Sequence, residues 1–207
     1  MSTALQSAYS RLIDRYSYPY QETILQFPAQ DVPPRELIIE IGFGMGDATY
    51  KTALENPEKD YIGIEVYKPG IGKLLDHIDR EGIENLKVIE HDAVEVLGQM
   101  IQNYSVNGFH IFFPDPWPKK KHHKRRIIQD EFVSLLIDKL VPGGYIYAVT
   151  DWEDYAEQML QVFGNQKLLL SEYENYAEPQ KWRPFTKFER KGKEKSHSIF
   201  ELLYKKR

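Results

Sequence analysis

The sequence contains no cysteine, which excludes disulfide bonds, iron–sulfur clusters and cysteine-ligated zinc. It also has no apolar run long enough to cross a bilayer, and its first twenty residues carry charges too early for a signal peptide. We therefore expect a cytoplasmic protein with no membrane contact. The 207 residues have a formal net charge of −4, which argues against a protein that coats nucleic acid over its whole surface.

Strand-like and helix-like segments alternate along the chain, and the length fits one domain with small additions. The expected strands are 36–42, 61–66, 86–92, 108–115, 145–151, 167–173 and 198–205. The expected helices are 45–57, 70–82, 93–101, 127–144 with its turn, and 152–163. This alternation predicts an α/β fold with a mostly parallel sheet. The last two strands have no helix between them, so the last strand is expected to be antiparallel.

The two ends of the chain differ from this regular pattern. Residues 1–34 are expected to form a helical or irregular lead-in, and residues 35–207 a single domain. Within it, residues 174–197 form a long polar and charged loop without an apolar period. Loops of this length are usually functional or disordered, and we expect this one to be mobile in the free protein.

A glycine-rich turn, Gly42, Gly44 and Gly46, lies between the first expected strand and its helix. Glycines at this place let the backbone turn tightly and approach a ligand closely. A dinucleotide-binding G-x-G-x-x-G motif needs a glycine where Asp47 stands, so the turn fits that motif poorly.

Four acids, Glu40, Glu65, Asp92 and Asp115, occur at or near the ends of the first four expected strands. In an open parallel sheet these ends form one ligand-binding edge. The carboxylates would repel a pyrophosphate and attract a cationic ligand. They therefore favour S-adenosyl-L-methionine, with its sulfonium and ammonium, over NAD. For a single acid the plainer explanation is a helix cap, and Asp92 could cap the helix at 93–101.

The stretch PDPWPKKKHHKRR begins at Pro114, holds Asp115 between two prolines, and then places six cations and two histidines in residues 119–126. Such a run is usually a solvated loop, but its position beside Asp115 favours contact with RNA. Trp117 could stack on a base or pack under the neighbouring prolines. The two histidines have no partner ligands nearby in sequence, so no metal is expected.

Read in order, the segments EIGFGMG, IGIEVYKPGIG, HDAVEVL, FFPDPWPKKKHHKRRI, VTDWEDYAEQM and TKFERKG resemble the bacterial tRNA (guanine-N7)-methyltransferases. The resemblance runs from about Glu36 to the C-terminal residue. It implies a Rossmann-like class I methyltransferase fold, with a seven-stranded sheet whose last strand is antiparallel. It also implies S-adenosyl-L-methionine as cofactor, tRNA as partner, and methylation of the variable-loop guanine at position 46.

The resemblance assigns roles to residues that match the family's motifs. The cofactor-binding set is Glu40, Gly42, Gly44, Gly46, Glu65, Asp92 and Asp115, and Asp115 is also the catalytic residue. The residues implied to hold the substrate guanosine are Lys119, Asp151, Thr186, Lys187, Phe188 and Glu189. The residues implied to meet RNA are Lys121, His122, His123, Lys124, Arg125 and Arg126.

Guanine N7 carries an in-plane lone pair, so its methylation needs placement and charge stabilisation more than a strong base. Asp115, Asp151 and Glu189 could share these tasks, and the sequence does not divide the roles among them. Three alternatives stay open: an exocyclic-amine methyltransferase, whose Asp-Pro-Pro-aromatic loop is similar to Asp115-Pro116-Trp117; an NAD-linked oxidoreductase; and an RNA-binding module without catalysis. A monomer and a homodimer are both compatible with the sequence.

Overall fold

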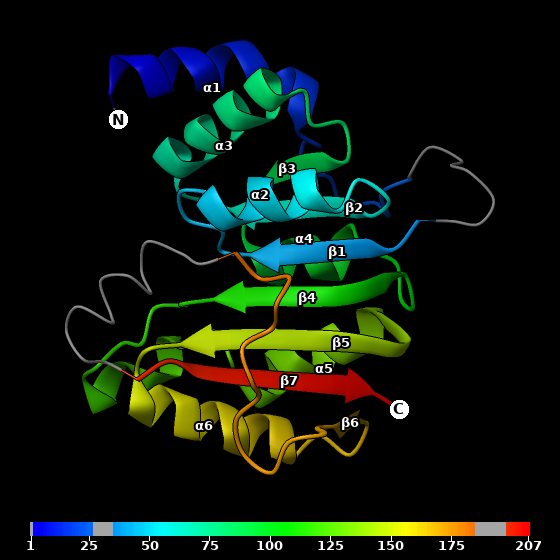
Figure 1. Cartoon of the computed structure of the whole chain (residues 1–207), viewed down its shortest axis with the longest axis vertical. Coiled ribbons are helices and arrows are strands. Elements are labelled where there is room, and N and C mark those ends of the chain that lie inside the picture. Colours follow the sequence, from blue (N-terminus) through cyan, green and yellow to red (C-terminus); the bar gives the residue numbers. More distant parts are fainter. Residues whose placement is uncertain (1, 27–34, 185–197) are drawn as a thin grey trace.

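The computed structural model describes residues 2–26, 35–184 and 198–207. Its centre is a seven-stranded sheet with the order β3-β2-β1-β4-β5-β7-β6 (Figure 1). The strands are β1 Leu37–Ile41, β2 Asp60–Glu65, β3 Leu86–Glu90, β4 Val106–Phe112, β5 Leu140–Thr150, β6 Leu169–Leu170 and β7 Phe200–Lys206. β1 to β5 pair in parallel, and β7 pairs antiparallel with both β5 and β6. The predicted fold class is confirmed.

Helices pack on the sheet as two layers. The helices are α1 Thr3–Tyr16, α2 Asp47–Glu55, α3 Lys68–Glu81, α4 Ala93–Gln99, α5 Asp130–Lys139 and α6 Glu153–Gly164. α3 contacts α1 and α2, whereas α5 contacts α4 and α6. Each layer buries apolar side chains against its face of the sheet, which is the usual way that amphipathic helices and a sheet form a core.

Several boundaries differ from the predicted ones. The expected helix at 127–144 begins at Asp130 and ends at Lys139, because the chain from Leu140 already joins the sheet by pairing with Val106. The expected strand at 167–173 is reduced to Leu169–Leu170. The cationic run, expected to be a loop, forms a 3₁₀ helix over Lys120–Arg125, named η1. None of these differences changes the order of the strands in the sheet.

Residues 174–184, expected to be mobile, lie across the face of the sheet (Figure 1). Ala177 donates its backbone N–H to the Glu201 carbonyl at 2.7 Å. Arg183 forms an ion pair with Glu201 at 2.6 Å, and these two side chains are 4% and 3% exposed. Trp182 stacks on His110 with ring centroids 4.8 Å apart. Residues 174–184 are therefore packed against the sheet by these contacts, and the remainder of that loop, residues 185–197, lies outside the described residues.

Candidate functional site

The carboxyl ends of β1, β4 and β5 lie at one side of the sheet (Figure 1). The glycine-rich turn follows β1, and all three of its glycines have left-handed backbone, with φ of 71° at Gly42, 57° at Gly44 and 71° at Gly46. A side chain added at Gly42 or Gly44 would meet nothing within 4 Å, whereas one at Gly46 would lie 2.9 Å from Leu74. The first two glycines therefore face open space that a ligand can enter, and the third packs against α3.

Glu65, the last residue of β2, closes this turn. Its Oε2 accepts a hydrogen bond from the Gly44 N–H at 2.8 Å, and its Oε1 accepts from Val66 and Tyr67 N–H at 2.8 and 3.0 Å. A carboxylate has about four lone-pair sites, so Oε2 keeps capacity for one further donor. The acid thus joins two strand ends and still offers an acceptor to a ligand hydroxyl.

Glu40 lies inside the protein beneath the turn and is 5% exposed. Burial raises the pKa of its carboxyl to about 7, and the neighbouring Glu65 charge adds to the rise. Within the ranges that the structure describes, no cationic side chain forms an ion pair with it. A buried carboxyl of this kind is stabilised in its charged form when a cationic group binds nearby.

Asp92 follows β3 and acts as the N-cap of α4. Its Oδ1 accepts hydrogen bonds from Val94 N–H at 2.8 Å and Glu95 N–H at 3.4 Å. The capping role considered from the sequence is therefore real. Because Asp92 is exposed, capping does not prevent its carboxylate from also facing a ligand.

Exposed apolar side chains flank these acids, and the sequence pattern did not single them out. Val66 is 63% exposed and Tyr67 53% exposed directly after Glu65, and Val94 is 49% exposed two residues after Asp92. An exposed apolar surface next to polar groups at a strand edge is typical of a ligand site. The signal that could have found them is their position immediately after strand-end acids. Together with the open turn, these carboxylates and apolar side chains fit a cationic nucleoside with a flat base, such as S-adenosyl-L-methionine.

Asp115 lies in an exposed position three residues beyond β4. The loop around it has unusual backbone, with φ of 50° at Phe113 and 44° at Trp117. Non-glycine residues rarely adopt such angles, and they cluster at functional sites where the surrounding structure supports them. Asp151 comes directly after β5, the hydrogen-bonded neighbour of β4, so the fold brings both acids to the same edge.

Trp117 contacts its own loop. The Arg125 guanidinium lies 4.9 Å from the Trp117 ring centroid, and the His122 ring meets it edge-on at 5.9 Å. The indole is therefore partly occupied by cation–π and aromatic contacts.

The cations after Asp115 divide into two groups. Lys119, Lys121, Lys124 and Arg125 are exposed, and His122 and His123 are half-buried on η1. Arg126 is different, because its residue is 2% exposed. The expectation that Arg126 meets RNA therefore needs correction, since a guanidinium inside the protein cannot reach a phosphate. Thr186, Lys187, Phe188 and Glu189 lie outside the described residues.

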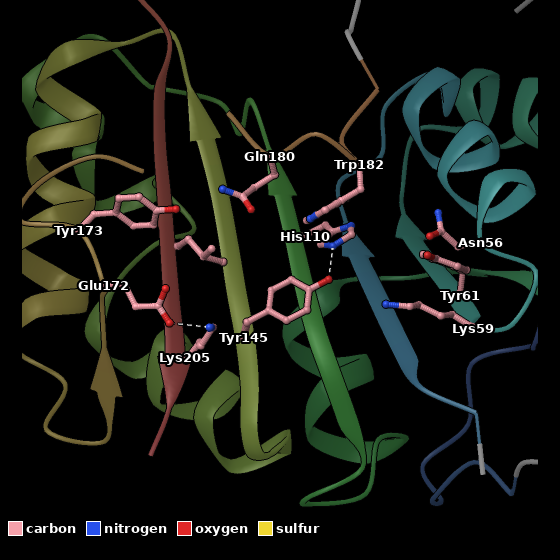
Figure 2. A pocket seen from close by; sticks show the side chains of 11 residues that line it. Asn56, Lys59, Tyr61, His110, Tyr145, Glu172, Tyr173, Gln180, Trp182 and Lys205 are labelled. Atoms are coloured by element: carbon pink, nitrogen blue, oxygen red, sulfur yellow. Dashed lines mark hydrogen bonds and ion pairs between the residues drawn. The ribbon is translucent and has the colours of Figure 1, made fainter. Parts of the chain in front are cut away.

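A separate hollow of about 340 Å³ lies on the sheet face, and none of the predicted site residues that the structure describes lines it (Figure 2). His110 lies at its floor, and burial lowers the pKa of its ring to about 3, so it is neutral. The two lysines of the hollow are already paired, Lys59 with Glu36 at 2.8 Å and Lys205 with Glu172 at 2.7 Å. Among its described lining residues the hollow therefore offers no unpaired charge for a ligand, and it includes neither the glycine turn nor the strand-end acids.

Two kinds of feature are absent from the described parts of the chain. No helix there is long and apolar enough to cross a membrane. Likewise, within these parts no group of three or more His, Cys, Asp or Glu side chains is placed to hold a metal ion.

Comparison with known proteins gives the family. A family model described as "Putative methyltransferase" matches residues 34–202. A protein of Nitrosomonas eutropha, named tRNA (guanine-N(7)-)-methyltransferase, is 46% identical over 205 residues, which cover 99% of this chain and 92% of that protein. One of the same name from Neisseria meningitidis serogroup C is 47% identical over 206 residues, covering 100% of this chain and 87% of that protein. The chain belongs to the tRNA (guanine-N7)-methyltransferase family.

Solved structures agree on the fold. The 16S rRNA methyltransferase KamB aligns with a TM-score of 0.61 at 13% identity, covering 90% of this chain and 99% of that one. The aminoglycoside resistance methyltransferase NpmB1 aligns with a TM-score of 0.57 at 15% identity, covering 84% and 88%. The family confirms the predicted cofactor, S-adenosyl-L-methionine, and removes the oxidoreductase alternative.

Proposed function

We propose that this protein transfers a methyl group from S-adenosyl-L-methionine to N7 of a guanine in tRNA, at position 46 of the variable loop. The observation that carries the proposal is the placement of exposed cations on η1 directly after the Asp115 loop, at the edge where the glycine turn and strand-end acids lie. A cationic cofactor is attracted by carboxylates and a phosphate backbone by cations, and here the strand-end acids and the cations of η1 lie on adjoining elements.

In this proposal Glu40, Gly42, Gly44, Gly46, Glu65 and Asp92 hold the cofactor. Bound there, S-adenosyl-L-methionine supplies an electrophilic methyl group on its sulfonium. Glu65 accepts three backbone hydrogen bonds and keeps acceptor capacity beyond them, which supports a contact with a ribose hydroxyl. The exposed Val66 and Val94 offer apolar surface for the adenine ring. The open backbone at Gly42 and Gly44 leaves room for the amino-acid part of the cofactor.

Asp115 is the proposed catalytic residue. Guanine N7 carries no proton that must be removed, so the proposed task of the Asp115 carboxylate is to stabilise the positive charge that develops on the guanine ring. Carboxylates can also accept hydrogen bonds from guanine N1–H and N2–H, which distinguishes guanine from adenine. Lys119 and Asp151, together with Thr186, Lys187, Phe188 and Glu189, are proposed to hold the guanosine.

The exposed side chains Lys121, Lys124 and Arg125 are proposed to bind phosphates beside the target base, with His122 and His123 next to them. A base in folded RNA must be held by its backbone while it enters a pocket. Grouping these side chains on the short helix η1 concentrates positive charge there, although the chain is acidic as a whole.

The test is incubation with unmodified tRNA transcript and labelled S-adenosyl-L-methionine, followed by borohydride–aniline cleavage, which cuts at N7-methylguanosine. We expect one cut, in the variable loop. A transcript with adenine at position 46 and the Asp115→Asn variant serve as controls, and both should remain uncut. Methyl incorporation without cleavage would instead indicate an exocyclic-amine methyltransferase, and incorporation with a cut elsewhere would refute position 46.

A further inference from the structure

Arg126 ends the cationic run but lies inside the protein. Its side chain is 1% exposed, and its guanidinium lies over the Tyr155 ring at 4.7 Å from the centroid. Lys124 and Arg125, directly before it, are exposed. A guanidinium is costly to bury unless its donors are satisfied, so the partners of Arg126 indicate what it does.

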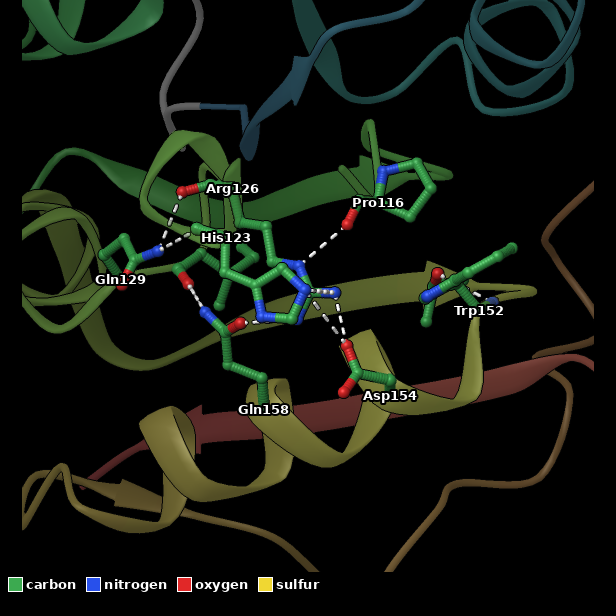
Figure 3. Close-up of polar contacts among 9 residues, drawn as sticks. Pro116, His123, Arg126, Gln129, Trp152, Asp154 and Gln158 are labelled. Carbon is green, nitrogen blue, oxygen red and sulfur yellow. Dashed lines mark hydrogen bonds and ion pairs between the residues drawn. The ribbon is translucent and has the colours of Figure 1, made fainter. Parts of the chain in front are cut away.

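The main partners of Arg126 come from the Asp115 loop and from α6 (Figure 3). Arg126 Nε donates to the Pro116 carbonyl oxygen at 2.8 Å. One terminal nitrogen donates to Gln158 Oε1 at 2.7 Å, and the other bonds the Asp154 carboxylate. Gln158 and Asp154 lie on α6, whereas Pro116 directly follows Asp115. The guanidinium is therefore a bridge from a packed helix to the loop that carries the proposed catalytic acid.

The α6 side of the bridge is itself fixed. Gln158 donates its Nε2–H to the Ile128 carbonyl at 3.1 Å, which orients its amide oxygen toward Arg126. The hydrogen bond and charge of Arg126 lower the pKa of Asp154 below its usual range, so Asp154 is ionised and balances the buried cation. His123 Nε2 lies 3.1 Å from the same guanidinium, which adds a contact to η1.

We propose that Arg126 is a positioning residue that fixes Asp115 for methyl transfer, and that it is not an RNA ligand. This rests on the proposed function. The Pro116 ring locks its own φ, so few torsions separate its held carbonyl from the Asp115 side chain. The loop also contains two left-handed non-glycine residues, Phe113 and Trp117, whose backbone needs support from outside the loop. Arg126 provides that support from the core side.

An arginine is required for this task. Its planar fork offers five N–H donors in fixed directions, which lets one side chain hold a carbonyl, an amide and a carboxylate at once. A lysine has a single ammonium on a flexible stem, so it can keep the charge next to Asp154 but not all three directions. Arg126→Lys therefore keeps the positive charge but loses the set of three directed hydrogen bonds, and Arg126→Met loses both the charge and the hydrogen bonds.

The experiment compares Arg126→Lys and Arg126→Met with Arg125→Met, a matched change one residue away on an exposed arginine. Steady-state methylation of tRNA gives kcat and KM. We expect kcat to fall about 100-fold in Arg126→Met, the scale typical of a catalytic group misplaced by about 1 Å, with KM for tRNA within about threefold of wild type. Arg126→Lys should recover only a small part of the loss. Arg125→Met should mainly raise KM for tRNA.

Amide hydrogen exchange at Phe113, whose N–H donates to the Val149 carbonyl at 2.7 Å at the start of the Asp115 loop, gives a readout in the free protein that does not depend on activity. Exchange should be faster in both Arg126 variants and unchanged in Arg125→Met. If Arg126→Met does not fold, Arg126→Lys decides. A raised KM with wild-type kcat in the Arg126 variants, or unchanged exchange at Phe113, overturns the proposal. If the wild-type protein makes no N7-methylguanosine the proposed function fails, while the exchange data still test the bridge.

Discussion

The buried carboxyl of Glu40, a proposed cofactor ligand, should give cofactor binding a predictable pH dependence. Burial raises its pKa from 4.5 to about 7, so the group changes charge near neutral pH. A cationic cofactor binds the ionised form better than the neutral form. With a pKa of about 7, roughly a tenth of the carboxyls are ionised at pH 6 and roughly nine tenths at pH 8. Affinity for S-adenosyl-L-methionine should therefore rise about tenfold between these values.

The stability of the free protein should move in the opposite direction. The folded pKa lies above the unfolded one, so the favourable contribution is complete below pH 4.5 and is lost as the pH rises through about 7. At about 1.4 kcal/mol per pKa unit, the difference between 4.5 and about 7 corresponds to about 3 kcal/mol of unfolding free energy. Glu40→Gln should remove this loss, because the amide does not ionise.

Isothermal titration calorimetry at pH 6, 7 and 8 measures the first effect, and urea unfolding from pH 4 to pH 8 measures the second, because the loss of stability begins above the unfolded pKa. S-adenosylhomocysteine, which keeps the ammonium but lacks the sulfonium charge, shows which cationic group Glu40 senses. Glu40→Gln should bind with little pH dependence and more weakly than wild type at pH 8. Wild-type affinity that is flat from pH 6 to 8, or a Glu40→Gln variant with the same slope as wild type, would refute this reasoning.

Two further changes test the site and its support. Replacing Lys121, Lys124 and Arg125 by alanine should weaken tRNA binding while cofactor affinity is retained. The slope of log affinity against log salt concentration should become less steep by up to about 0.9 for each phosphate that is no longer neutralised. Filter binding across salt concentrations measures this slope, and an unchanged slope contradicts the prediction. Gly70→Ala places a methyl group 1.8 Å from the Gly44 carbonyl oxygen, so it should displace the glycine turn and weaken cofactor binding at least tenfold, as measured by calorimetry. The control Gly98→Ala, whose added methyl group meets nothing within 4 Å, should leave cofactor binding unchanged.

The sheet was predictable because its signals are local. Alternating apolar and amphipathic runs place the parallel strands, and the missing helix before β7 predicts its direction. The long helix α1 was anticipated only as part of a lead-in, because its packing depends on a distant partner. At Gly72 of α3, an added side chain would lie 2.5 Å from the Leu5 carbonyl oxygen, and nothing near either residue in the sequence indicates this close approach.

The candidate site was predictable only in its placement along the chain. Acids at strand ends are visible in a sequence because parallel strands end at one edge, so Glu40, Glu65 and Asp92 could be named together. The division of the cationic run into exposed and buried residues could not be predicted, because the burial of Arg126 depends on partners on α6 that follow about thirty residues later. A charged side chain is expected to be exposed to water, and only the tertiary structure shows which cation is buried beside a carboxylate.

The position of β7 has a consequence for how the molecule is made. β7 lies between β5 and β6 in the sheet, although its residues follow both in the chain. β6 has no place in the sheet until β7 has paired with β5, so this half of the sheet can assemble only after residue 206 is synthesised. During translation the β5 edge therefore waits without its partner, and an unpaired strand edge promotes aggregation. We expect truncation before Phe200 to yield insoluble protein even though every proposed cofactor ligand is present.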